Sequence, residues 1–218
     1  MESEVAQLPL SDQLWLWFQK NKKPVLWAVS ILVIGGLVVW FAVYRSQEQQ
    51  TEAGQALSSV VFAQSSTQGA QAESDPAAYL KVAAEYPHSE AAARALLLAG
   101  SSYFTEGKYD QAKAQFQRVT REYPASNFRS QALLGVAACL EAQGNATEAT
   151  AAYKELIDQH PNSPVIPQAR FALGRLAEAQ HQPEQAYNHY EQVAQMDPYG
   201  SIGSDTGGSI RQPAALCG

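Results

Sequence analysis

Cysteine is scarce in this sequence, which has 218 residues and only two cysteines, Cys139 and Cys217, whose separation fits no metal-ligand spacing. Cys139 lies in an apolar helical pattern, where a small core residue is the simplest interpretation. The four histidines form no zinc-binding pair on a helix, and no P-loop or dinucleotide-binding motif occurs. The sequence therefore predicts neither a metal site nor a cofactor.

Basic residues are also few, with 15 Lys and Arg against 21 Asp and Glu, and the formal net charge is -6. Before residue 46 there are four basic and three acidic residues, and after it 11 basic and 18 acidic residues. A basic stripe that could follow a phosphate backbone is missing, so nucleic acid is not an expected partner. The composition is rich in Ala and Gln, which favours helices.

Charge is absent from the run PVLWAVSILVIGGLVVWFAVY, Pro24 to Tyr44. In a helix that rises about 1.5 Å per residue, this run matches a hydrocarbon core of about 30 Å. It is longer than the apolar part of a cleavable signal peptide and is not followed by a small-residue cleavage site. We therefore predict an uncleaved transmembrane helix over residues 24–45; a buried core helix of a soluble protein is the alternative.

The residues that flank this run predict its orientation. Lys20, Lys22 and Lys23 precede it, and Arg45 alone follows it. By the positive-inside rule, residues 1–23 form a cytoplasmic tail, and everything after residue 45 lies across the membrane.

Proline recurs at a fixed interval in the rest of the chain. Pro87, Pro124, Pro161 and Pro198 are each 37 residues apart. The same step relates three apolar columns, which are Gly100, Ala137 and Gly174; Ala112, Ala149 and Ala186; and Phe116, Tyr153 and Tyr190. A turn pattern lies between the columns, as TEGKYDQA, AQGNATEA and AQHQPEQA. Each unit is predicted to be two helices and a turn, ended by a proline, so the fold class is all-α.

The first full unit resembles the tetratricopeptide repeat family, because Gly100, Tyr103, Ala112, Phe116 and Pro124 match that family's pattern and spacing. The resemblance implies a helical solenoid with a 37-residue period, a degenerate first repeat and linker over residues 46–92, and full repeats over residues 93–199. It also implies a concave face, lined by the first helices, that suits extended peptides or partner helices. By phase, the candidate groove residues are Arg94, Ser101, Gln131, Glu141, Gln168, Arg175 and Glu178.

An anchor followed directly by such repeats resembles the bacterial single-span family that includes the ancillary subunit of the Sec translocon. This resemblance implies a single-pass protein of the bacterial inner membrane with a periplasmic repeat domain. Its implied partners are exported or envelope polypeptides, translocon subunits or periplasmic chaperones. A further binding hypothesis is self-assembly through the third repeat, which has no polar capping helix.

The stretch GSDTGGSIRQPAALCG, Gly203 to Gly218, resembles the amidase signature family, including the A subunit of tRNA-dependent amidotransferase. The resemblance implies an acyl nucleophile at Ser209, supported by Arg211. The Gly-Ser loop and the lysine segment that supply the family's base are absent, so an amidase or amidotransferase subunit is only the alternative to a non-enzymatic scaffold. We interpret residues 200–218 as a fragment from another reading frame or gene that forms a disordered tail. A natural tail with accidental similarity is the other possibility.

Overall fold

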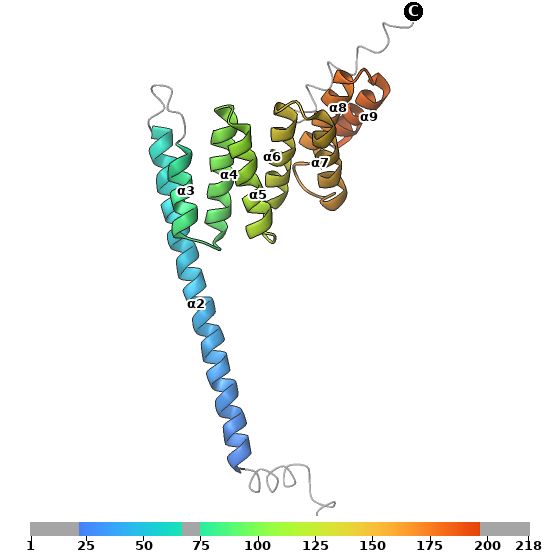
Figure 1. Cartoon of the computed structure of the whole chain (residues 1–218). Coiled ribbons are helices and arrows are strands. Elements are labelled where there is room, and N and C mark those ends of the chain that lie inside the picture. The colour runs from blue at the N-terminus through green and yellow to red at the C-terminus, as the bar shows by residue number, and fades with distance from the viewer. Residues whose placement is uncertain (1–21, 67–74, 197–218) are drawn as a thin grey trace, which may run out of the picture. The chain divides into compact units, whose positions relative to one another are not determined.

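A computed structural model describes residues 22–66 and 75–196 and divides the chain into two compact units, Met1–Gln49 and Gln50–Gly218. All regular secondary structure in the described ranges is helical (Figure 1). The helices are α2 (Lys22–Ser66), α3 (Pro76–Glu85), α4 (Glu90–Thr105), α5 (Tyr109–Glu122), α6 (Arg129–Ala142), α7 (Ala146–Gln159), α8 (Ile166–Ala179) and α9 (Pro183–Met196). The predictions for the N-terminal tail up to residue 21 and for residues 200–218 lie outside the described residues.

The first unit contains the N-terminal part of α2, and the uncharged run Pro24 to Tyr44 is helical as predicted. Large apolar side chains along it are exposed, including Trp27, Ile31, Leu32, Leu37 and Phe41. Among the residues that the structure describes, no helix has the length and apolar character needed to cross a membrane. The transmembrane helix over residues 24–45 stays a prediction.

The second unit is a row of helix pairs in which consecutive helices from α3 to α9 pack on each other (Figure 1). The second helices of the last three pairs begin at Tyr109, Ala146 and Pro183, in the predicted 37-residue step. The first helices α4 and α6 also contact each other. This arrangement is the all-α solenoid that the repeat predicted.

The prolines of the repeat end the second helices. The helices α3, α5 and α7 each end two residues before Pro87, Pro124 or Pro161. The residue before a proline is disfavoured in the α region. The intervening Tyr86, Tyr123 and His160 leave the helical conformation, with φ values of -121°, -129° and -132°.

The small and aromatic columns pack as the repeat predicted. The rings of Phe116, Tyr153 and Tyr190 are buried. A Cβ added to Gly100 would lie 2.6 Å from Cε1 of Phe116, and one added to Gly174 would overlap the Tyr190 ring. The missing side chains therefore give the aromatic rings of the second helices their place against the first helices.

Candidate functional site

Helix α4 is buried around most of its circumference and leaves one narrow strip exposed. Arg94, Ser101 and Thr105 are exposed, while Ala93 and Ala95 are buried. Residues four and seven apart lie on one face of a helix. We call the line formed by Arg94, Ser101 and Thr105 the α4 strip.

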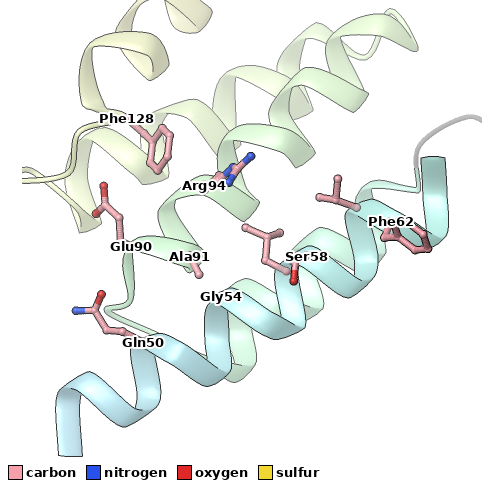
Figure 2. Close-up of a pocket in the computed structure, with 10 residues that line it drawn as sticks. Gln50, Gly54, Ser58, Phe62, Glu90, Ala91, Arg94 and Phe128 are labelled. Carbon is pink, nitrogen blue, oxygen red and sulfur yellow. The ribbon is translucent and has the colours of Figure 1, made fainter. Parts of the chain in front are cut away.

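A hollow of about 460 Å³ lies between α2 and α4, beside the N-terminal end of the strip. Figure 2 shows Gln50, Gly54 and Ser58 of α2 on one side and Ala91 and Arg94 of α4 on the other. This hollow, the α2–α4 pocket, is lined by Gln50, Gly54, Leu57, Ser58, Val61, Phe62, Glu90, Ala91, Arg94 and Phe128. Its walls are mainly apolar, with Arg94 and Glu90 as the charged groups.

A second hollow, of about 250 Å³, lies between α4 and α6, beside the C-terminal end of the strip. This α4–α6 pocket is lined by Leu97, Ser101, Phe104, Thr105, Phe116, Gln131, Leu134, Gly135 and Ala138. A Cβ added to Gly135 would lie 2.7 Å from Cδ2 of Phe116. Because Gly135 of α6 has no side chain, the ring of Phe116 on α5 can pack against it and line the pocket.

The two charged groups of the α2–α4 pocket differ in their surroundings. One oxygen of Glu90, Oε1, accepts hydrogen bonds from Ser126 Oγ at 2.8 Å and from the backbone N–H of Asn127 at 3.1 Å. The carboxylate is therefore turned toward the loop between α5 and α6. Arg94 is exposed and forms no ion pair within the described part of the chain. Its guanidinium can meet a carboxylate from outside.

Beyond the pockets, the candidate groove residues of α6 and α8 pair with each other. Nη2 of Arg175 lies 2.8 Å from Oε1 of Glu141, and Tyr153 donates its hydroxyl to Oε2 of the same carboxylate at 2.8 Å. One repeat later, Tyr190 donates to Oε2 of Glu178 at 2.9 Å. Tyr153 therefore joins α7 to α6, and Tyr190 joins α9 to α8.

Burial and the same hydrogen bonds favour the protonated form of both tyrosines. Burial, followed by the hydrogen bond to Glu141, raises the pKa of Tyr153 well above its usual value of 10.0. Burial and the hydrogen bond to Glu178 raise the pKa of Tyr190 in the same way. A neutral hydroxyl is therefore the stable donor to each carboxylate at physiological pH.

The candidate groove residues predicted from the sequence differ in their surroundings. Arg94 lines the α2–α4 pocket, Ser101 and Gln131 line the α4–α6 pocket, and Glu141 pairs with Arg175. Glu178 is held by Tyr190, and Gln168 is exposed in the first turn of α8. Ser209 lies outside the described residues. In the parts that the structure describes, no three His, Cys, Asp or Glu side chains come together as a metal site.

The sequence prediction missed the apolar walls of both pockets. Leu57 lies 37 residues before Arg94, so one more backward step of the repeat finds it. Phe128 lies in the link before α6, and no column of the repeat marks it. Gly135 is also outside the columns, because its role depends on the ring of Phe116 from the preceding pair.

This geometry agrees with the comparisons with known proteins. The family described as Tetratricopeptide repeat-like domain matches residues 16–159, more than half of the chain. The chain belongs to the tetratricopeptide repeat-like family. A second match, described as Tetratricopeptide repeat, covers residues 128–198. The resemblance predicted from the 37-residue pattern is confirmed. No curated protein matches the chain.

Solved structures are similar to this chain at low sequence identity. A variant of a kinesin light chain from Podosopora anserina, with nearly identical TPR-like repeats, is 15% identical over 76% of this chain and 83% of its own, with a TM-score of 0.50. PcrH from Pseudomonas aeruginosa is 17% identical over 56% of this chain and 91% of its own, with a TM-score of 0.49. MamA of AMB-1 is 19% identical over 75% of this chain and 95% of its own, with a TM-score of 0.45.

Proposed function

We propose that this repeat protein is a membrane-tethered scaffold that binds exported or envelope polypeptides in the groove along α4. Tetratricopeptide repeats imply a protein–protein interaction scaffold, and the observation that carries the proposal is the α4 strip. It is an exposed line with a mainly apolar pocket at each end. Concave solenoid faces of this kind suit extended binding partners.

The tether is supported by the uncharged run Pro24 to Tyr44. Trp27 is 72% exposed and Leu32 is 75% exposed, so neither side chain is buried against the described part of the chain, and both would be stabilised by an apolar environment. A lipid bilayer would supply such an environment, and the lysines before the run favour a cytoplasmic N-terminus.

The tether is tested by extraction of host membranes with alkaline carbonate. The full chain is expected to stay in the membrane pellet. Replacement of both Leu32 and Leu37 by lysine should release it, because each lysine costs about 3 kcal/mol at the centre of a spanning helix. Extraction of the unsubstituted chain into the supernatant would exclude an integral anchor.

The choice of partner is supported by the resemblance of an anchor followed by repeats to the ancillary translocon subunit family. It is tested in intact membranes with a photoreactive residue at Gln131, which lines the α4–α6 pocket, followed by mass spectrometry of the products. We expect translocon subunits, periplasmic chaperones or newly exported chains. Capture of cytoplasmic proteins alone, with the same probe, would exclude an exported repeat domain.

A further inference from the structure

The two pockets are joined by the α4 strip and lie a fixed distance apart. Ala91 and Arg94 belong to the α2–α4 pocket, and Ser101 and Phe104 belong to the α4–α6 pocket. The two sets are ten residues apart along one helix, which is about 15 Å at a rise of about 1.5 Å per residue. A ligand that fills both pockets must advance about this length along α4.

The narrow exposed surface of the α4 strip favours an extended ligand over a helical one. Between the pockets α4 exposes only the line of Arg94, Ser101 and Thr105, and the residues beside that line are buried or half-buried. A helix with side chains is about 10–12 Å wide, which exceeds a single line of residues. An extended chain advances about 3.3 Å per residue and turns every second side chain to the same face. Its residues i and i+4 therefore face one way, about 13 Å apart.

The charge of Arg94 indicates which group of a bound ligand should lie between the two pockets. It is the last residue of the α2–α4 pocket along α4, and Leu97 is the first residue of the α4–α6 pocket. Its guanidinium has no ion-pair partner among the described residues, while the carboxylate of Glu90, one turn earlier, is engaged by the loop at Ser126 and Asn127. A carboxylate on residue i+2 of an extended ligand would face the same side as i and i+4.

We propose that the groove selects an extended polypeptide segment with apolar side chains at i and i+4 and a carboxylate at i+2. The apolar side chains enter the α2–α4 and α4–α6 pockets, and the carboxylate pairs with Arg94. This inference rests on the proposed function, because it assumes that the groove binds polypeptides, and it adds the pattern that the groove prefers.

The test is a fluorescence-polarisation titration of the full chain in detergent with a short labelled peptide. The peptide consists of serine and glycine, with two leucines four residues apart and an aspartate midway between them. Arg94→Glu is expected to weaken binding about tenfold, because it replaces an attraction by a repulsion. A peptide with lysine in place of the aspartate should regain affinity for Arg94→Glu and lose it for the unsubstituted chain. Lys154→Glu, an exposed charge change on α7, is the matched control and should leave binding unchanged.

A second pair of variants tests the pocket without depending on charge. Gly54 lines the α2–α4 pocket, and a Cβ added there would meet no atom within 4 Å, so a larger side chain at this position begins in open space beside the pocket. Gly54→Phe should abolish leucine-dependent binding, while Gly54→Ala, which leaves the pocket open, should retain it.

The outcomes separate this inference from the proposed function. Equal binding of the aspartate and lysine peptides, blocked by Gly54→Phe, would overturn the preferred pattern and leave the groove as a polypeptide site. Binding that survives both Arg94→Glu and Gly54→Phe, or no binding of any peptide, would overturn both.

Discussion

His181 holds the left-handed backbone conformation, with φ of 57°, that Gly144 holds 37 residues earlier with φ of 80°. Gly107, a further 37 residues back, has φ of 74°. All three residues lie in the turn between the first and second helix of a pair. The turn therefore has the same left-handed backbone conformation in all three units. In the third unit the residue in this conformation is a histidine, whose Cβ disfavours it.

Replacement of His181 by glycine should stabilise the protein by about 1 kcal/mol, because a left-handed conformation costs a residue with a Cβ about 1–2 kcal/mol. The measurement is urea unfolding followed by circular dichroism. The control is Gln180→Gly, one residue earlier, where φ is -89°, and it should destabilise the protein. Loss of stability in His181→Gly would contradict the account of this turn.

Replacement of glycine by alanine should destabilise the protein where the glycine is packed against a ring and stabilise it where the surrounding space is open. Gly100→Ala and Gly135→Ala each place a Cβ within 3 Å of the Phe116 ring, and we expect losses of about 1–3 kcal/mol. Gly54→Ala, in a helix with nothing within 4 Å, should gain up to about 1 kcal/mol. Thermal unfolding of the three variants checks both signs, and equal effects at all three positions would show that Phe116 does not depend on the glycines.

The ion pair of Glu141 and Arg175 should contribute little to the free energy of unfolding. The hydrogen bond from Tyr153 to Glu141 should contribute more. Arg175 is 53% exposed at its side chain, so a double-mutant cycle of Glu141→Gln and Arg175→Gln should give a coupling of about 0.5–1 kcal/mol. Tyr153→Phe should cost about 1 kcal/mol, since it leaves a half-buried carboxylate oxygen without its donor. A coupling near zero would show that the pair does not form in solution.

Alkaline pH should destabilise the fold through Cys139. Burial is the main cause that raises the pKa of the Cys139 thiol from 9.0 to about 11, with a smaller opposing effect from Lys113. The unfolded chain then loses the thiol proton at a lower pH than the folded chain, so stability falls as pH rises from 9 toward 11.

Urea unfolding at several pH values between 9 and 10 measures this effect, in a chain whose other cysteine, Cys217, is replaced by alanine. In that background Cys139→Ala should show a shallower fall of the unfolding free energy with pH. Identical slopes with and without Cys139 would contradict a raised pKa for this thiol.

The sequence predicted the repeat well because its signals are local and recur. The prolines end α3, α5 and α7 where the pattern placed them, and the Gly100 column lies against aromatic rings as expected. The pocket walls were harder to predict because they join residues from different pairs. Phe128 reaches the α2–α4 pocket from a link between α5 and α6, and Gly135 accommodates a ring from α5. Neither role follows from the 37-residue step.

The binding of polypeptides in the groove along α4 is tested most directly by crosslinking the purified full chain to reduced, carboxymethylated lactalbumin, a permanently unfolded protein. Photoreactive residues are placed at Gln131, which lines the α4–α6 pocket, and at the exposed Lys154 of α7, which lines neither pocket. The account predicts strong crosslinking from Gln131 that Gly54→Phe reduces, and weak crosslinking from Lys154. Equal crosslinking from the two positions, unaffected by Gly54→Phe, would contradict it.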